Sequence, residues 1–192
     1  DLKIKVLHTP GHTIESTSYL LKDTNDEDHC LFTGDTLFLG DVGRPDLSQK
    51  GSDMTAADLA GMAFDSLRNK IMPLKDDLLI YPAHGAGSAC GKNMMKETVD
   101  TLGHQKEVNY ALRSDMTKEE FIKEVTVGLD APPAYFPLNV KLNKEGYSDL
   151  DQILSKGTQA LSVEEFAHKA NDPKVLILDV RSKEEFKDGH IP

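Results

Sequence analysis

The sequence predicts an α/β fold that is followed by a second, smaller α/β unit. Two observations carry this prediction. Short apolar runs with β-like spacing end in turns of Gly or Pro, and stretches with helical spacing lie between them. The chain has 192 residues, enough for one full domain or for one and a fraction. Hydrophobic residues make up 39% of it, so a packed core is expected.

Charge and cysteine content narrow the class of partner. The net charge of −10 and the pI of about 5.1 speak against nucleic acid, which would require a basic stripe. No apolar run approaches the ~18 residues of a membrane span. Cys30 and Cys90 are too few for a disulfide framework, so free thiols in the cytoplasm are expected. Because the chain starts at Asp1 inside a strand-like run, we expect the natural N-terminus and any targeting segment further upstream.

Residues 1–113 are predicted to form the first domain. Alternation in "LKIKVLH" and apolar runs further along predict β-strands, with an acidic loop at 23–29. A sheet with one apolar face is expected, built by Val6, Leu20, Phe32 and Ile80. The predicted strands are 2–8, 17–22, 30–34 and 77–82.

Helices are predicted on either side of the last strand of this domain. Leu59, Met62, Ala63 and Leu67 recur at helical spacing, which predicts a helix over 55–71. A second helical stretch is predicted over 92–112. The segment "GDVGRPDLSQKGSD" at 40–53 is rich in Gly and Pro turns, which is typical of a long functional loop.

The composition changes after residue 113. Residues 114–157 read as a helical and Pro-rich connector, ordered by Tyr135 and Phe136. Residues 158–192 are predicted to form a truncated α/β unit, in which "VLILDV" at 175–180 is a buried strand. Capping boxes predict helix starts in both segments. The paired residues are Thr117 with Glu120, Ser162 with Glu165, and Ser182 with Glu185.

Three polar side chains follow apolar β runs at the point where each run ends. They are His12 in "TPGHT", Asp35 in "FTGDT" and His84 in "YPAHG", and each lies close to Gly or Pro. Turns of this kind aim a short side chain across a sheet edge, and strands of one sheet bring such ends together. Imidazole and carboxylate are donors for Zn or non-haem Fe. The alternative is that each residue caps its own strand.

These motifs resemble a known superfamily. "HTPGHT", "FTGDTLF" and "YPAHG" are similar to the second half of the metallo-β-lactamase superfamily, an αββα sandwich with metals at one edge of its sheets. The first-half signature, His-x-His-x-Asp-His, is absent from the chain and is expected upstream of Asp1. The resemblance implies that this chain supplies only part of the metal site.

Two further motifs narrow the resemblance. "GDVGRPDL" resembles the Gly-Arg-Thr-Asp loop of persulfide dioxygenases, with Pro45 in place of the usual Thr. "LSVEEFAHK" and "VLILDVRSKEEFKDGHIP" resemble the opening of a rhodanese domain, whose nucleophilic Cys would lie beyond Pro192. The dioxygenase–rhodanese fusion family carries both motifs, and the resemblances to the metallo-β-lactamase superfamily and to rhodanese together cover nearly the whole chain.

The resemblance implies one Fe(II) on a two-His, one-carboxylate face, where O2 oxidises a thiol persulfide to sulfite and free thiol. His12 and Asp35 match the second His and the carboxylate, while the first His is missing from the chain. His84 matches the ligand of a second metal in two-metal hydrolases. In the dioxygenases the corresponding His stays near the iron without ligating it. His84 is therefore expected to support catalysis from beside the iron and not as a ligand.

Three other residues are candidates with open alternatives. Arg44 would orient an anionic thiol substrate, or it forms an internal ion pair with Asp46 or Asp41. By resemblance Tyr81 would hydrogen-bond the substrate, or it is a core tyrosine. Cys90 in its small-residue loop would carry or receive sulfane sulfur, or it is a buried small hydrophobe.

The leading hypothesis is therefore an iron persulfide dioxygenase coupled to rhodanese sulfur transfer, with this fragment inactive alone. Glutathione, coenzyme A or a similar thiol would carry the persulfide, and a homodimer is left open. The alternative enzyme is a glyoxalase II-like zinc thioesterase, a hydroxyacylglutathione hydrolase, with water activated between metals. The alternative from another class is a non-catalytic sulfur carrier or scaffold.

Overall fold

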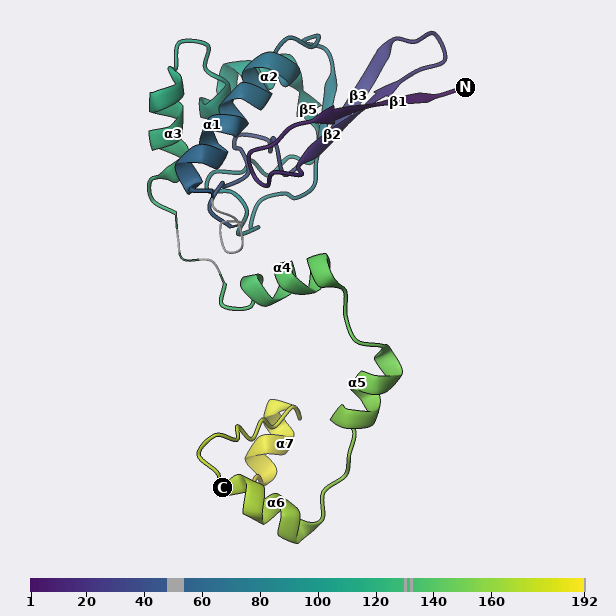
Figure 1. Cartoon of the computed structure of the whole chain (residues 1–192), viewed down its shortest axis with the longest axis vertical. Helices are drawn as coiled ribbons and strands as arrows, with labels where there is room; N and C mark the ends of the chain where they lie inside the picture. The colour runs from purple at the N-terminus through teal and green to yellow at the C-terminus, as the bar shows by residue number, and fades with distance from the viewer. Residues whose placement is uncertain (48–53, 130, 132, 192) are drawn as a thin grey trace. The chain divides into compact units, whose positions relative to one another are not determined.

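The computed structural model describes residues 1–192 except 48–53, 130, 132 and 192. The chain divides into two compact units, Asp1–Lys144 and Glu145–Pro192 (Figure 1). The predicted boundaries after 113 and 157 stay a prediction. The end of the loop predicted at 40–53 lies outside the described residues.

The first unit contains a sheet with the strand order β1-β2-β3-β4-β5. β1, β2 and β3 form an antiparallel meander, whereas β4 pairs with β3 in parallel. The parallel pairing matters for the site, because the carboxyl ends of β3 and β4 then lie at the same edge of the sheet. The strands span Lys3–His8, Thr17–Lys22, Asp28–Gly34, Leu79–Pro82 and Asp100–Thr101.

The register places the apolar side chains of the strands on two faces. Leu20, Leu31 and Ile80 are register partners and are buried. Phe32 stands opposite Tyr81 on the other face, where both side chains are partly exposed. The expectation that Val6, Leu20, Phe32 and Ile80 share a face is therefore wrong. Successive side chains of a strand alternate between faces, and the register pairs odd with even positions.

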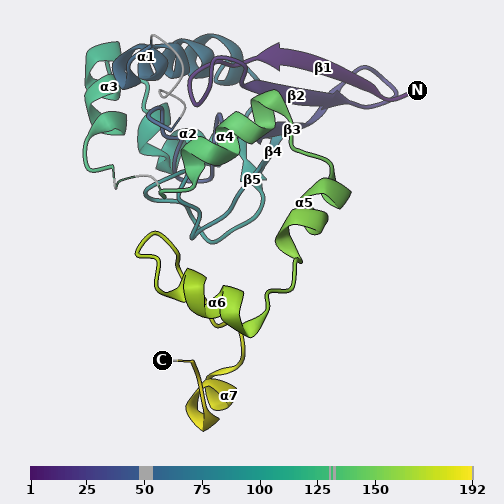
Figure 2. The ribbon, with the colours of Figure 1, turned by 60° about the horizontal axis from the view of Figure 1, so that its bottom comes forward.

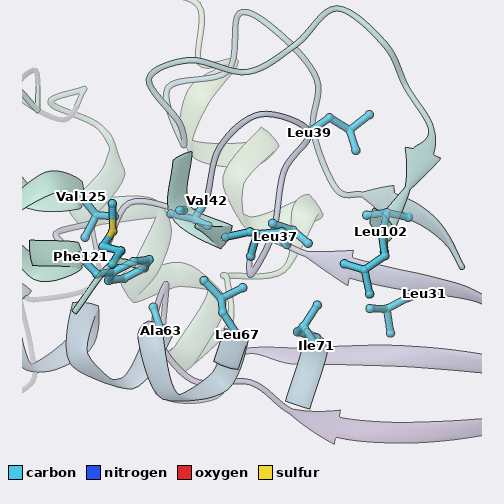
Figure 3. Packing of buried hydrophobic residues seen from close by; sticks show 14 of the residues in the cluster. Leu31, Leu37, Leu39, Val42, Ala63, Leu67, Ile71, Leu102, Phe121 and Val125 are labelled. Carbon is cyan, nitrogen blue, oxygen red and sulfur yellow. The ribbon is translucent and has the colours of Figure 1, made fainter. Parts of the chain in front are cut away.

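Helices cover the buried face of the sheet. α1 (Ala56–Ser66) starts at a capping box of Thr55 and Asp58 and continues as a π-helical turn, η1 (Leu67–Ile71). Leu67 and Ile71 point from this helix into the buried cluster that also contains Leu31 and Leu37 (Figure 3). Fully burying one such side chain contributes about 1.5–3 kcal/mol. The predicted helix over 55–71 is confirmed.

A second helix, α3, packs against α1 and contributes side chains to the same core. α3 (Lys118–Thr126) begins at the predicted capping box of Thr117 and Glu120 and packs beside α1 (Figures 1 and 2). Phe121 of α3 is fully buried and meets the Phe64 ring edge-on at 5.5 Å between centroids. The core of the unit thus lies between the sheet, α1 and α3.

Residues 92–112 differ from the prediction of one helix. Only Leu102–Val108 (α2) is helical, followed by a short 3-10 turn at Tyr110–Leu112 (η2), while the segment before β5 is irregular. The reason is that Asp100 and Thr101 pair with β4 to form β5, and the Thr101 side chain then caps the N-terminus of α2. In the irregular part before β5, the Asp41 carboxylate accepts hydrogen bonds from the backbone N–H groups of Lys92 and Asn93.

The regular secondary structure described in the connector and the second unit is helical. α4 (Phe136–Glu145) lies in the Pro-rich segment, and the rings of Tyr135 and Phe136 contact each other edge-on at 5.1 Å. The second unit contains α5 (Leu150–Gly157), α6 (Val163–Ala170) and α7 (Lys183–Asp188). The predicted capping boxes at Ser162 and Ser182 open α6 and α7.

The prediction of a buried strand at 175–180 is wrong. "VLILDV" forms no strand in the described part of the second unit, and its side chains are exposed. A strand needs a neighbour to pair its backbone groups, and the described residues of this unit offer three helices and no strand. Arg181 is instead held by Asp179 and the carbonyl of Gly189.

Candidate metal centre

His12 lies in a tight turn after β1 that is pressed against α1. Ser66 of α1 donates a hydrogen bond to the carbonyl of Pro10 at 2.8 Å. Gly11 has a φ of +155°, and a Cβ there would lie 2.5 Å from the Cβ of Ala63. Gly11 is therefore required by the close approach to α1. This contact fixes the turn that presents His12.

The ring of His12 is oriented by a backbone carbonyl. Its Nδ1 lies 2.9 Å from the carbonyl oxygen of Arg44. Since that oxygen can only accept, Nδ1 carries the proton and the lone pair is on Nε2. A hydrogen bond of this kind on the remote ring nitrogen is typical of metal-binding histidines.

Asp35 and His84 come together because β3 and β4 end side by side. Gly34, with φ +56°, closes β3, and its carbonyl accepts a hydrogen bond from Ala83 at 3.1 Å. His84 Nε2 then lies 3.1 Å from Asp35 Oδ1. That oxygen is buried and has no hydrogen-bond partner among the described residues. The two atoms are close without the orientation of a hydrogen bond.

Cys90 completes this group. One ligand atom each from Asp35, His84 and Cys90 lie within 4.8 Å of one another. Burial raises the pKa of the Cys90 thiol above its ordinary value, and the nearby Asp35 carboxylate adds to that shift. A hydrogen bond to Ser88 and the charge of Arg44 act in the opposite direction but do not offset it. Because its pKa lies above the ordinary thiol value, Cys90 is protonated at neutral pH when no metal is bound.

Arg44 holds the loop that carries Cys90. Its backbone N–H donates to the carbonyl of Cys90 at 3.0 Å, and its guanidinium donates to the carbonyl of Ala89 at 3.3 Å. The same guanidinium forms a bidentate pair with Asp46, with two N–O distances of 2.7 Å. The Arg44 side chain is only 6% exposed. The structure thus shows the internal ion pair with Asp46, and the role of Arg44 in substrate binding stays a prediction.

Gly43 is the residue that lets the two ligand turns meet. A Cβ on Gly43 would lie 1.9 Å from the carbonyl oxygen of Asp35 and 3.1 Å from the Cβ of His12. The Gly-rich loop therefore passes directly between the turn of His12 and the turn of Asp35. Only a residue without a side chain fits there.

Asp41 holds the loops around the site together, a role that the sequence did not predict for it. Its buried carboxylate accepts hydrogen bonds from the hydroxyl of Tyr110 at 2.9 Å and from the N–H of Asn93 at 2.7 Å, besides the N–H of Lys92. Burial raises the pKa of Tyr110, and Asp41 raises it further, so the phenol stays a donor. The signal that could have found Asp41 is an acidic residue in an apolar loop, "FLGDVG".

Tyr81 and Cys30 lie away from the cluster of donors. Tyr81 is on β4, on the partly exposed face of the sheet, with its ring 5.6 Å from that of Phe32. Cys30 is buried in β3. His12 is not part of the three-residue group of close ligand atoms within the described ranges, although its turn adjoins that of Asp35.

The donor set fits a metal ion. A carboxylate oxygen that is buried without a hydrogen-bond partner lies beside an imidazole nitrogen, with a second imidazole and a thiol at neighbouring turns. Carboxylate, imidazole and thiolate are the ligands that proteins use for Zn and Fe. The edge of the sheet at β3 and β4 is therefore a candidate metal centre.

Comparison with known proteins agrees with this geometry. A metallo-β-lactamase structure from Staphylococcus aureus aligns with 100% of this chain and 52% of its own chain, with 37% identity and a TM-score of 0.75. The ETHE1 structure from Myxococcus xanthus aligns with 75% of this chain and 54% of its own, with 31% identity and a TM-score of 0.55. The fold is thus that of about half of a metallo-β-lactamase protein.

Sequence relatives and a domain family add to this. Hydroxyacylglutathione hydrolase GloC from Haemophilus influenzae is 32% identical over 88 residues, which is 46% of this chain and 36% of that protein. An uncharacterized Mycobacterium tuberculosis protein is 34% identical over 92 residues, 47% of this chain and 37% of that protein. The chain thus spans little more than a third of these curated relatives. Residues 162–192 match the family "Rhodanese-like domain".

This chain is therefore similar to part of proteins with the metallo-β-lactamase fold, and its residues 162–192 match a rhodanese-like domain. The resemblance of the sequence motifs to this superfamily and to rhodanese is confirmed. The residue roles inside the centre stay predictions.

Proposed function

We propose that the protein containing this chain is a metal-dependent persulfide dioxygenase coupled to rhodanese sulfur transfer. The observation that carries the proposal is the rhodanese-like segment at 162–192 in the same chain as the metal-donor cluster. A rhodanese-like unit handles sulfane sulfur, so a sulfur substrate is the simplest assumption for the metal centre encoded in the same chain. The cysteine thiol beside Asp35 and His84 supports it.

Within this proposal each residue has a defined task. Asp35 and His12, with a further His from outside the chain, would hold one Fe(II), which supplies the binding of O2 and of the substrate sulfur when present. His84, whose Nε2 lies 3.1 Å from Asp35 Oδ1, would stay beside the metal and hold or move a proton there. Arg44 would orient the substrate anion, and Tyr81, which lies away from the donor cluster beside Phe32, keeps its role as a substrate hydrogen-bond donor only as a prediction.

The reaction balances with one water. A persulfide RSSH, O2 and H2O give RSH and sulfurous acid, which is sulfite at neutral pH. The terminal sulfur loses four electrons, O2 takes them up, and the S–S bond breaks. The centre must therefore admit a small anionic thiol persulfide and O2.

The charge and the cysteines of the chain bear on its partners and its location. The net charge of −10 fits no nucleic-acid role. No helix in the described residues is long and apolar enough to cross a membrane. We place the protein in the cytoplasm, where its free thiols stay reduced.

A second candidate is a zinc thioesterase of the glyoxalase II kind. The observation that favours it is the similarity to proteins named hydroxyacylglutathione hydrolase, from Haemophilus influenzae and Dictyostelium discoideum. In that case His84 would ligate a second metal and the two metals would activate water. A non-catalytic sulfur carrier is the third possibility, and it predicts no bound metal at all.

Metal analysis of the purified protein separates these candidates. The dioxygenase proposal expects iron at a metal-to-protein ratio near one in a protein that includes the missing His. The ratio should fall at least ~10-fold in Asp35→Asn, because a direct ligand is lost. Asp65→Asn, which changes an exposed carboxylate on α1, is the matched control and should keep its iron. Two zinc ions per chain would favour the thioesterase, and no metal would favour the carrier.

A further inference from the structure

We propose that Gln105 positions the Gly-rich loop of the candidate metal centre, and that protonation of His104 at the surface tightens this hold. A chain of hydrogen bonds runs from His104 through Asp100 and Gln105 to the backbone of Gly40. The inference does not depend on the reaction proposed above, since it concerns the order of the loop and not its chemistry.

Gln105 joins α2 to the start of the Gly-rich loop. Its side chain is fully buried. Its Oε1 accepts a hydrogen bond from the N–H of Gly40 at 2.7 Å, and its Nε2 donates to Asp100 Oδ2 at 2.7 Å. Asn109 follows four residues later, and its Nδ2 donates to the carbonyl of Asp41 at 3.1 Å. Two buried amide side chains thus hold the first residues of this loop.

Asp100 decides which way the amide of Gln105 points. An ionised carboxylate only accepts hydrogen bonds, so it takes the NH2 group of Gln105 and leaves the amide oxygen for the N–H of Gly40. With the amide reversed, two donors would face each other at Gly40 and two acceptors at Asp100. Buried polar groups without a partner are costly, so this arrangement is strongly preferred.

The loop that begins at Gly40 reaches both ligand turns of the centre. Gly43 lies three residues further on, where a Cβ would meet the Asp35 carbonyl and the His12 side chain. The carbonyl of Arg44 then lies 2.9 Å from His12 Nδ1. Because Gln105 fixes the loop at Gly40, it positions the part of the loop that orients His12.

His104 is the partly exposed end of the chain of hydrogen bonds. Its Nδ1 lies 2.5 Å from Asp100 Oδ2. The hydrogen bond to Asp100 and the charge of that carboxylate raise the pKa of His104, against a smaller effect of burial. Glu107 on α2 and Glu97 in the segment before β5 raise it further. The imidazolium therefore holds Asp100 more firmly than the neutral ring does.

The two pKa shifts define the pH range in which this pair is complete. Burial disfavours the charged form of Asp100, but hydrogen bonds from His104, Gln105 and the N–H of Thr101 outweigh it and lower the pKa. The contribution of Asp100 is present above about pH 4 and is lost as the pH falls through its lowered pKa. The contribution of His104 is present below about pH 6.5 and is lost as the pH rises through its raised pKa. The loop is therefore held most firmly between these limits.

Hydrogen exchange of the Gly40 amide, followed by NMR in residues 1–192, tests the proposal. After correction for the intrinsic exchange rate, we expect opening at Gly40 to be about threefold more frequent at about pH 8 than at about pH 6. His104→Gln cannot be protonated and should remove this difference. His168→Gln, which changes an exposed histidine on α6, is the matched control and should keep it.

A pH titration of the unmodified chain keeps the proposal testable if a variant does not fold. The chemical shift of the Gly40 amide should change with the same midpoint as the ring protons of His104. Gln105→Ala should remove this change at Gly40 while His104 still titrates. Equal opening of Gly40 at both pH values in the original chain would overturn the proposal. A pH difference that persists in His104→Gln would overturn it as well.

Discussion

At the scale of single residues, the centre depends on how closely two turns approach. His12 and Asp35 follow different strands. The Gly-rich loop passes between their two turns at Gly43. No catalytic group is contributed by Gly43. Its absence of a side chain is what allows the Asp35 carbonyl and the His12 side chain to flank the same point.

Gly43→Ala is expected to disrupt the centre. Its Cβ would lie 1.9 Å from the Asp35 carbonyl oxygen, so the loop must move. Overpacking of this kind costs about 1–3 kcal/mol of unfolding free energy. Urea denaturation should show that loss, and metal binding should weaken with it.

The matched control for this substitution is Gly85→Ala. A Cβ on Gly85 would meet no atom within 4 Å, although the residue adjoins His84. Its stability should stay within about 0.5 kcal/mol of the original. Equal losses in the two variants would show that the close packing at Gly43 is not what matters.

At the scale of elements, Asp41 holds two loops together. One carboxylate accepts the hydroxyl of Tyr110 and the N–H groups of Lys92 and Asn93, so the loop after β3 and the loop before β5 move as one. The second of these loops carries Cys90 next to the metal donors. The irregular segment 92–99 is therefore part of the site's frame.

Asp41→Ala should release this segment. The hydrogen bonds that its carboxylate accepts are lost, and the buried donors left behind each cost about 1–3 kcal/mol. Hydrogen exchange should then show faster exchange of the Lys92 and Asn93 amides. Asp58→Ala, which removes only the capping box of α1, is the control and should leave both amides protected. Unchanged exchange in Asp41→Ala would contradict the role given to this residue.

The sequence predicted the elements that have strong local signals. The strand ends that carry His12, Asp35 and His84 followed from apolar runs and Gly or Pro turns, and each capping box at Thr117, Ser162 and Ser182 is present. These signals are local, so a single sequence contains them.

What the sequence could not predict depends on contacts between distant segments. The pairing of Asp100 and Thr101 with β4 interrupts the helix that the sequence predicted at 92–112, and the contact of Asp41 with Lys92 and Asn93 spans more than 50 residues. The strand predicted at 175–180 has the right residues but no described strand to pair with. Pairing and long-range hydrogen bonds decide such cases, and local pattern does not.

At the scale of the whole molecule, one face of the sheet has large apolar side chains in contact with solvent. Ile4 and Val6 are more than 60% exposed, and Tyr19, Phe32 and Tyr81 are partly exposed on the same face. Contiguous apolar surface of this kind marks an interface. The similar Staphylococcus aureus structure is about twice as long as the part that this chain matches.

Residues 1–192 alone should therefore associate through this face. Phe32→Lys is expected to shift size-exclusion elution toward the monomer with little change in the unfolding free energy. Leu20→Lys, on the helix-covered face, places a charge in the core and should unfold the unit. If the original chain elutes as a monomer and Phe32→Lys changes nothing, the exposed face is not an interface.

Oxygen consumption tests the central claim most directly. In a protein that joins this chain to an upstream half-sandwich, glutathione persulfide should drive O2 uptake with one sulfite formed per O2. Asp35→Asn should reduce the rate at least ~100-fold, since a metal ligand is lost, whereas Asp65→Asn should leave it unchanged. Residues 1–192 alone should show no uptake. Hydrolysis of a hydroxyacylglutathione thioester without any persulfide-dependent O2 uptake would contradict the account and identify a thioesterase.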